Sequence, residues 1–281
     1  MTDRHKPLLI VDGDSFAHRY YHALPKSIRR ADGGAGNLLD GVGGLLIRLW
    51  DEERPRAVLV AWDTLTVPTY RHTALPAYQS GREFAPELLD QLDLAPQLVA
   101  AMGFVPAKAD GYEADDFLAA AVAVEEARGG TALVASGDRD TFQLVSERTT
   151  VLQPQVGGGP LARIGPTEVR ERYGVAPAQV PDFIALRGDP SDRIPGARGV
   201  GAKTAATVLG QYGSLDAALE QGRFAAEADN LRLFRHIATM DAEAPLPALD
   251  DQQPTWPAAA GLARDWGLGR LAGRLEALSS S

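Results

Sequence analysis

Cysteine is absent from the sequence, and so is any apolar run of the roughly 18 residues that a membrane-spanning helix needs. The missing cysteine excludes disulfides and thiolate metal sites, so any metal must be bound through oxygen or imidazole ligands. The polar start of the chain, residues 1–7, has no signal-type apolar segment. These absences favour a cytoplasmic protein with no membrane partner.

Positive charge is also in deficit. The 281 residues include 28 Lys and Arg against 37 Asp and Glu, which gives a net charge of −9. This balance argues against a protein that holds nucleic acid mainly by bulk positive charge, although it says nothing about where the charges sit. The length is sufficient for two domains at about 150 residues each, and a monomer is the expected state.

Three short apolar runs, at 8–11, 57–62 and 132–135, have the length and β-branched content of buried strands. Helical spacing marks 38–50, 86–102 and 114–128 between them. Strands that alternate with helices predict an α/β fold with an open, mainly parallel sheet. Asp12, Asp63 and Asp138 follow the three runs closely. Because ligands bind such sheets beyond the carboxyl ends of the strands, the three acids are expected to converge on one crevice.

The chain changes character after a Gly-rich break at 157–160. From residue 166 onward short helical stretches are interrupted by Gly and Pro, which predicts a smaller all-helical domain. We therefore expect an α/β domain at 1–160 and a helical domain at 161–281. Residues 242–257, with four prolines, are expected to form a loop, and the amphipathic stretch 258–278 is expected to pack back on the body of the protein.

Further acids cluster at the predicted element ends. Three acids in four residues begin the helix predicted at 114–128, and two Gly-Asp loops each carry a second Asp two or three positions later. Taken one at a time, these are better explained as an acidic cap on a solvent-exposed helix and as ordinary turns. The whole set is Asp12, Asp63, Glu113, Asp115, Asp116, Asp138, Asp140, Asp189 and Asp192.

Nine carboxylates cannot lie close together without cations among them, because their mutual repulsion raises their pKa values. Hard divalent ions such as Mg²⁺ or Mn²⁺ prefer oxygen ligands, and pairs of such ions about 3.5–4 Å apart serve in-line phosphodiester cleavage. The acidic set therefore predicts two Mg²⁺ or Mn²⁺ ions and hydrolysis of a phosphate ester. The five histidines have no zinc-site spacing.

A basic hairpin follows the last acids. Residues 193–213 carry Arg193, Arg198 and Lys203 and no acid, and Gly199 and Gly201 precede a helical stretch that includes Thr204. Glycines that open a helix expose backbone N–H groups that bind phosphate. The stretch is a candidate helix-hairpin-helix at about 194–220 that contacts the DNA backbone. Packing alone would explain the hairpin equally well.

A second cationic stretch, 64–82, combines Arg71, Tyr78 and Arg82 without a carboxylate, as expected of a surface that stacks single-stranded bases. Arg19, within an Arg-Tyr-Tyr-His run, invites the same interpretation. A partly apolar surface loop is the alternative for both stretches.

In combination these motifs resemble the 5′-nuclease family of 5′–3′ exonucleases and flap endonucleases, which includes the N-terminal nuclease domain of bacterial DNA polymerase I. The matching pieces occur in family order. They are Val-Asp-Gly-Asp-Ser at 11–15, Ala-Trp-Asp at 61–63, Tyr-Arg at 70–71 with Tyr78 and Arg82, Gly-Tyr-Glu-Ala-Asp-Asp at 111–116, Gly-Asp-Arg-Asp at 137–140, Gly-Asp-Pro-Ser-Asp at 188–192 and Gly-Val-Gly-Ala-Lys-Thr at 199–204.

The resemblance implies a PIN-like sheet, a helical arch at about 64–100 that admits a free 5′ end, and a helix-3-turn-helix domain. It implies a first metal near Asp12, Asp63, Glu113, Asp115 and Asp116, and a second near Asp138, Asp140, Asp189 and Asp192. Arg71 and Arg82 would contact the scissile phosphate, and Tyr78 would stack on a base. The implied substrate is DNA with a free 5′ end, a flap or a nicked duplex, and the implied hairpin ligand is K⁺.

Two positions depart from the family pattern. Gln79 stands where the arch usually has Lys, which removes one cationic contact to the phosphate, and Arg193 stands where Asn is usual and could add one. A DNA-binding module with weak catalysis is therefore one alternative function. The other is a haloacid-dehalogenase-type phosphatase with Asp12 as its nucleophile, but that reading leaves the acids at 113–116 and the hairpin unexplained.

Overall fold

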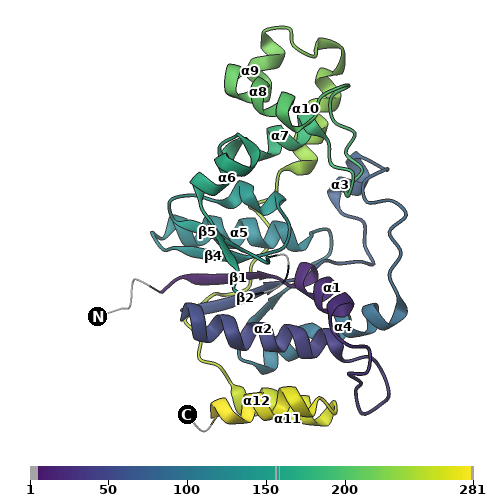
Figure 1. Cartoon of the computed structure of the whole chain (residues 1–281), viewed down its shortest axis with the longest axis vertical. Helices are drawn as coiled ribbons and strands as arrows, with labels where there is room; N and C mark the ends of the chain where they lie inside the picture. The colour runs from purple at the N-terminus through teal and green to yellow at the C-terminus, as the bar shows by residue number, and fades with distance from the viewer. Residues whose placement is uncertain (1–5, 156, 158, 280–281) are drawn as a thin grey trace.

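The computed structural model describes residues 6–155, 157 and 159–279 (Figure 1). The predicted Gly-rich break and the polar start of the chain lie partly outside these residues. Among the described residues, no helix has both the length and the apolar character needed to cross a membrane.

A six-stranded sheet forms the centre of the molecule, with strand order β3-β2-β1-β4-β5-β6. All neighbouring strands are parallel except the antiparallel pair β5 and β6. The predicted α/β class and mainly parallel sheet are confirmed. The strands are β1 (Leu8–Asp12), β2 (Ala57–Ala61), β3 (Val105–Ala107), β4 (Ala132–Ala135), β5 (Thr149–Gln153) and β6 (Ala162–Ile164).

Alternate residues of β1 supply the two faces of the core. Leu8 and Ile10 pack in one hydrophobic cluster, and Leu9 and Val11 pack in the other. Helix α5 (Ala114–Ala127) covers the first face, while α1 (Gly13–Ala23), α2 (Asn37–Glu53) and α4 (Pro86–Ala101) cover the second. Figure 1 shows these helices on opposite sides of the strands. The helices predicted at 38–50, 86–102 and 114–128 correspond to α2, α4 and α5.

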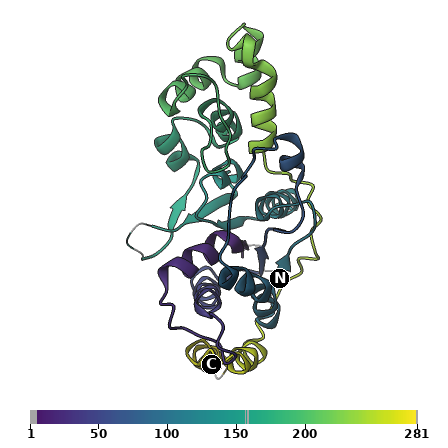
Figure 2. The same ribbon diagram turned by 90° about the vertical axis from the view of Figure 1, so that its right-hand side faces the viewer.

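The helical domain stacks above the β4–β6 side of the sheet (Figures 1 and 2). Its α-helices are α6 (Pro166–Tyr173), α7 (Val180–Arg187), α8 (Ala202–Tyr212), α9 (Leu215–Glu220) and α10 (Ala228–Ala238), with short 3₁₀ turns η1 (Asp140–Leu144), η2 (Pro177–Gln179) and η3 (Ala225–Glu227) around them. Because β6 pairs with β5, the sheet continues past the boundary predicted at residue 160. The helical region begins at α6.

The segment predicted as an arch divides into two parts. Residues 64–84, which include the short helix α3 (Tyr70–Ala74), contribute many side chains to a cleft beside the sheet. Helix α4 instead buries Leu88, Leu92 and Leu98 in the core with α2. The range predicted as an arch thus combines a segment that lines the cleft, up to about residue 85, with a helix that packs in the core.

After α10 the chain returns along the α/β domain. The backbone N–H of Gln252 donates to the carbonyl of Arg56 at 2.8 Å, and the Gln252 side chain accepts from the N–H of Val58 at 2.9 Å. The last helices, α11 (Trp256–Asp265) and α12 (Gly269–Ser279), pack against α4 and α2. Both views show this helix pair at the end of the molecule opposite the helical domain (Figures 1 and 2).

Candidate active site

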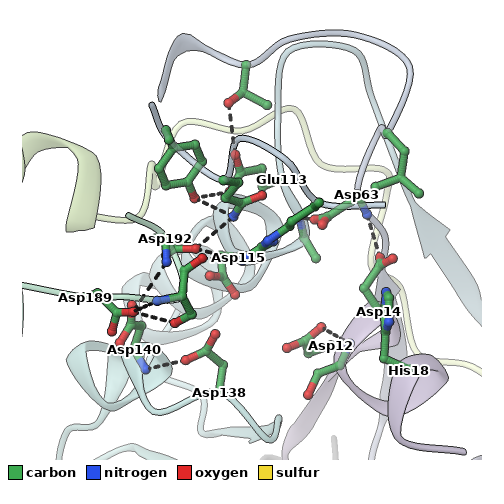
Figure 3. Close-up of a pocket in the computed structure, with 18 of the residues that line it drawn as sticks. Asp12, Asp14, His18, Asp63, Glu113, Asp115, Asp138, Asp140, Asp189 and Asp192 are labelled. Atoms are coloured by element: carbon green, nitrogen blue, oxygen red, sulfur yellow. Dashed lines mark hydrogen bonds and ion pairs between the residues drawn. The ribbon is translucent and has the colours of Figure 1, made fainter. Parts of the chain in front are cut away.

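Carboxylates gather at the carboxyl edge of the sheet, where three adjacent parallel strands end. Asp12 ends β1, Asp63 is the second residue after β2, and Asp138 lies on the loop after β4. All three line one cleft of about 1020 Å³. Eight of the nine predicted carboxylates line this cleft, and Asp14 lines it as well. Figure 3 shows Asp12, Asp14 and Asp63 on its right and Asp140, Asp189 and Asp192 on its left.

Hydrogen bonds between neighbouring elements orient the first group. Asp12 caps helix α1 by accepting from the N–H of Ser15 at 3.0 Å, and its other oxygen accepts from the Ser136 hydroxyl at 2.6 Å. Asp14 accepts from the N–H of Asp63 at 2.7 Å. Asp63 in turn accepts from the N–H of Ala114, the first residue of α5, at 2.7 Å. These hydrogen bonds fix the ends of β1 and β2 and the start of α5 relative to one another.

Glu113 is the N-cap of α5 and links the sheet edge to the arch. One of its carboxylate oxygens accepts from the Thr69 hydroxyl, and the other accepts from the Tyr78 hydroxyl, both at 2.9 Å. Asp115, two residues along, lines the cleft in the first turn of the helix. The helix dipole favours acids at this end, so the acidic turn is compatible with a stable helix.

The second group comes from the loop before α8 and the turn after β4. The 188–194 loop closes with paired backbone hydrogen bonds between Asp189 and Ile194, each 2.8 Å. Asp189 accepts from the Arg187 guanidinium at 2.8 Å. One oxygen of Asp192 accepts from both Gln79 and Arg82, each at 3.0 Å. Asp140 begins η1 at the same edge.

The electrostatics of the cleft disfavour this many ionised groups. Burial raises the pKa of Asp12 to about 7, and the nearby Asp138 and Asp63 add to the effect. Burial also raises the pKa of Asp192 to about 6. For Asp115, burial followed by repulsion from Asp138 and Asp12 raises the pKa well above the usual range. The pKa of Asp14 rises in the same way, through burial and then Asp63.

Two predicted catalytic residues lie outside the lining of the cleft. Asp116 is completely buried and accepts from both terminal nitrogens of Arg71, at 2.9 and 2.6 Å. Arg71 is only 2% exposed and also donates to the carbonyl of Ile237 at 3.0 Å. The two side chains therefore contact each other inside the protein, whereas the family resemblance implies that Asp116 contacts a metal ion and that Arg71 contacts the scissile phosphate. Together the two residues form an internal joint between α3, α5 and the end of α10.

Of the other residues predicted to contact DNA, Tyr78 and Arg82 line the cleft and Arg19 does not. Tyr78 lines the cleft with its hydroxyl bound to Glu113, but it is only 4% exposed, so its ring is not presented for base stacking. Arg82 lines the cleft and pairs with Asp192. Arg19 is exposed on α1 and donates to the carbonyl of Gln155 at 3.3 Å, and it is not among the residues that line the cleft.

Asp14 lines the cleft but is not one of the nine predicted carboxylates. It stands two residues after Asp12 in the Asp-Gly-Asp-Ser motif, so the signal was present in the sequence. Its position in the first turn of α1 places it beside the end of β2, which only the parallel pairing of β1 with β2 reveals.

The side chains that line the cleft have the chemistry that a hard divalent cation requires. The donor set consists of carboxylate oxygens, and their raised pKa values show that positive charge at the cleft would be favourable. Within the described residues, no three acidic or histidine side chains are close enough to form a preassembled metal site. A hard divalent ion that keeps several of its waters, and takes only one or two protein carboxylates directly, does not require such a preassembled site.

The predicted hairpin precedes α8. Gly199 has a φ of 74°, which favours glycine, and Gly201 is the N-cap of α8. Arg193, Arg198, Lys203 and Thr204 are exposed. The backbone N–H of Arg198 donates to Glu227 at 3.0 Å, while Lys203 lines a second pocket of about 620 Å³.

This second pocket is lined by four cationic side chains and no acid: Arg139, Arg172, Arg187 and Lys203. Arg139, Tyr173 and Arg187 line both pockets, so the basic pocket adjoins the acidic cleft. The molecule therefore places positive charge beside the carboxylates, at the surface where the hairpin lies.

Solved structures share the fold. A structure of T5 5′-exonuclease with divalent metal ions (zinc) bound has a TM-score of 0.68 at 18% identity and covers 96% of this chain and 98% of its own. The catalytic core of Rad2 in complex with DNA substrate has a TM-score of 0.62 at 12% identity and covers 97% and 91%.

Curated relatives are more similar in sequence. DNA polymerase I of Mycobacterium tuberculosis is 42% identical over 216 residues, 76% of this chain and 24% of the relative. The thermostable DNA polymerase I of Thermus thermophilus is 36% identical over 250 residues, 85% and 29%. The chain thus spans about a quarter of the length of these relatives.

Two family descriptions match the chain in succession and confirm the predicted resemblance. Residues 7–174 match the N-terminal resolvase-like domain of 5′-3′ exonucleases. Residues 175–258 match the C-terminal SAM fold of the same enzymes. The chain belongs to the 5′-3′ exonuclease family.

Proposed function

We propose that this chain is a divalent-metal-dependent 5′ nuclease that hydrolyses DNA phosphodiester bonds, as a 5′–3′ exonuclease and a flap endonuclease, in DNA replication and repair. The observation that carries the proposal is the cleft in which carboxylates from five different segments face one another, beside a pocket whose charged side chains are all cationic. The proposed partner is DNA with a free 5′ end, a flap or a nicked duplex, bound by a monomer.

Two groups of acids would hold the metal ions. Asp12, Asp14, Asp63, Glu113 and Asp115 lie on one side and in the middle of the cleft, and Asp138, Asp140, Asp189 and Asp192 complete the other side. When bound, two Mg²⁺ or Mn²⁺ ions would stabilise negative charge on the phosphate and lower the pKa of the attacking water.

Other residues of the site would orient the carboxylates or bind the phosphates of the DNA. Ser136 and the N–H of Ser15 fix the direction of the Asp12 carboxylate. Arg139 and Lys203 line the basic pocket, where they would receive phosphates of the duplex. The glycines at the start of α8 leave backbone N–H groups accessible to a further phosphate, and carbonyls of the same hairpin would bind K⁺.

A flap-cleavage assay tests the proposal. A 5′-labelled flap duplex should be cut in Mg²⁺ and remain intact in chelator. Asp138→Asn should reduce cleavage by about 100-fold or more and retain flap binding, because it removes a metal ligand without removing positive charge. Asp265→Asn, an exposed acid on α11, is the matched control and should cut normally. Flap binding without cleavage in both Mg²⁺ and Mn²⁺ would refute the nuclease proposal.

A further inference from the structure

The turn of the arch at 78–82 lies directly on the loop that carries Asp192. The backbone N–H of Gln79 donates to the carbonyl of Asp192 at 3.3 Å, and the Arg82 guanidinium donates to the carbonyl of Ser191 at 3.3 Å. On the other side of the same turn, Tyr78 contacts Glu113 at the start of α5. The turn therefore joins acids that belong to different domains of the molecule.

The side-chain amide of Gln79 completes this connection. Its nitrogen donates to the Tyr78 hydroxyl oxygen at 2.9 Å and to the Asp192 carboxylate at 3.0 Å. The Tyr78 hydroxyl donates its own proton to Glu113 at 2.9 Å. The two amide protons and the one phenolic proton thus make a continuous chain of hydrogen bonds from Asp192 to Glu113. Such chains are strengthened by mutual polarisation inside a protein.

The backbone has an unfavourable conformation at this contact. Gln79 has a φ of 47°, and Arg193, next to Asp192, has a φ of 57°. Residues other than glycine seldom adopt this left-handed region, because it brings the Cβ atom close to the backbone. Both residues stand at the contact between the arch and the 188–194 loop. Two residues with a left-handed backbone therefore flank this one contact.

The same contacts argue against a role for Gln79 as a substitute for a phosphate-binding lysine. Both of its amide protons are already used within the protein. Gln79 also brings no charge, so Arg82 supplies the cation that pairs with Asp192. A neutral donor orients Asp192 but leaves more of its negative charge available to a metal ion than a second cation would leave.

We propose that Gln79 is a positioning residue that fixes Asp192 relative to Glu113, so that the two sides of the acidic cleft are set for divalent cations. The proposal rests on the proposed nuclease function for its meaning, but it concerns metal affinity and can be measured without cleavage. Gln79 acts through Tyr78 and Asp192 and has no part in binding the phosphate.

Direct titration of the metal-free 281-residue chain with Mn²⁺ tests the inference. Gln79→Ala should weaken Mn²⁺ binding by about tenfold, because loss of a residue that orients a ligand usually costs 10–100-fold in metal affinity. Tyr78→Phe, which breaks the same chain at its other end, should cause a similar loss. The double variant should be little worse than either single variant, since the chain is already broken. Ser80→Ala, on the same turn, is the matched control and should bind Mn²⁺ normally.

Cleavage and DNA binding give an independent readout. In Gln79→Ala the Mg²⁺ concentration for half-maximal flap cleavage should rise by about the same tenfold factor, with cleavage restored at saturating Mg²⁺. Flap affinity in Ca²⁺ should not change. Unchanged Mn²⁺ affinity, or an equal loss in Ser80→Ala, would overturn the inference. If the unmodified chain binds Mn²⁺ but leaves flaps uncut, the nuclease proposal fails, and the titrations still decide the role of Gln79.

Discussion

Adjacent acids have opposite environments at the start of α5. Asp115 lines the acidic cleft, where burial and the neighbouring Asp138 raise its pKa well above the usual range. Asp116 is fully buried on another side of the helix and is paired with Arg71. Successive helical residues point about 100° apart, which is why neighbours in the sequence can serve different purposes. One acid is suited to a metal ion, and the other is suited to holding the domains together.

Asp116→Asn should therefore destabilise the protein. The change leaves the Arg71 guanidinium buried without its main counter-charge, and breaking a buried pair in this way typically costs about 3–5 kcal/mol. The free energy of unfolding, measured by urea denaturation in chelator near pH 8, should fall by an amount of that order.

Asp115→Asn is the matched control, because it makes the same substitution one residue away. It removes a carboxylate that its neighbours repel, so the metal-free protein should be at least as stable as the unmodified chain. Equal losses of stability in the two variants would contradict the distinction between them.

At the level of elements, the N-terminus of α8 is the part of the hairpin that reaches the basic pocket. Lys203 lies in the first turn of α8 and lines that pocket together with Arg139. Lys203→Ala should weaken flap binding about three- to tenfold near 100 mM salt, whatever the DNA sequence. It should also reduce the slope of log affinity against log salt concentration by about one. Binding isotherms in Ca²⁺ at several salt concentrations measure both quantities.

Arg270→Ala provides the control for overall charge. Arg270 is exposed on α12, which lies at the opposite end of the molecule from α8 (Figure 1). Its removal should leave both the affinity and the salt slope unchanged. The same loss in both variants would mean that net charge, and not the α8 terminus, determines binding.

The strands that the sequence predicts lie in the middle of the sheet, and those that it does not predict lie outside them. The three central strands β1, β2 and β4 were predicted because they are buried on both faces, which requires short, continuous apolar runs. The strands outside them were missed because they carry polar residues or proline. Pro106 occupies β3, which is an edge strand, where a missing N–H is tolerated. Thr149 and Thr150 begin β5, and β6 has only three residues.

The site was predictable to the extent that it depends on strand ends. Asp12, Asp63 and Asp138 converge because parallel strands bring their carboxyl ends to one edge. The direction in which a side chain leaves the first turn of a helix depends on contacts that are remote in sequence. The Asp116 contact with Arg71 spans 45 positions, and the Asp14 contact with Asp63 spans 49. Local sequence therefore could not show that Asp116 pairs with Arg71, nor that Asp14 of the Asp-Gly-Asp-Ser motif lies beside Asp63.

For the molecule as a whole, the acidic excess is concentrated in one place. Ten Asp and Glu side chains line the cleft against three arginines, in a chain of net charge −9. Most of the net charge thus belongs to the candidate metal site, and the remaining surface is close to neutral. A net charge that first counts against nucleic acid becomes compatible with DNA binding once cations occupy the cleft.

The pH dependence of stability follows from this concentration. A carboxyl whose pKa is raised by folding stabilises the fold only while it is protonated, so its contribution is complete below about pH 4 and is lost as the pH rises through the raised value. For Asp12 and Asp192 the raised values are about 7 and about 6. The metal-free protein should therefore lose stability from these groups between about pH 4 and pH 7. Divalent ions bind the ionised form and should reverse the loss.

The stabilisation by Mg²⁺ should accordingly grow with pH. Thermal unfolding at about 10 mM Mg²⁺, compared with NaCl at equal ionic strength, should show little gain in Tm near pH 5 and a gain of several degrees near pH 7.5, because only ionised carboxylates bind the metal. Below its pKa, each carboxyl that must lose a proton weakens the apparent metal affinity by about tenfold per pH unit. A gain in Tm that is the same at both pH values would show that the stabilising ions bind away from the buried carboxylates.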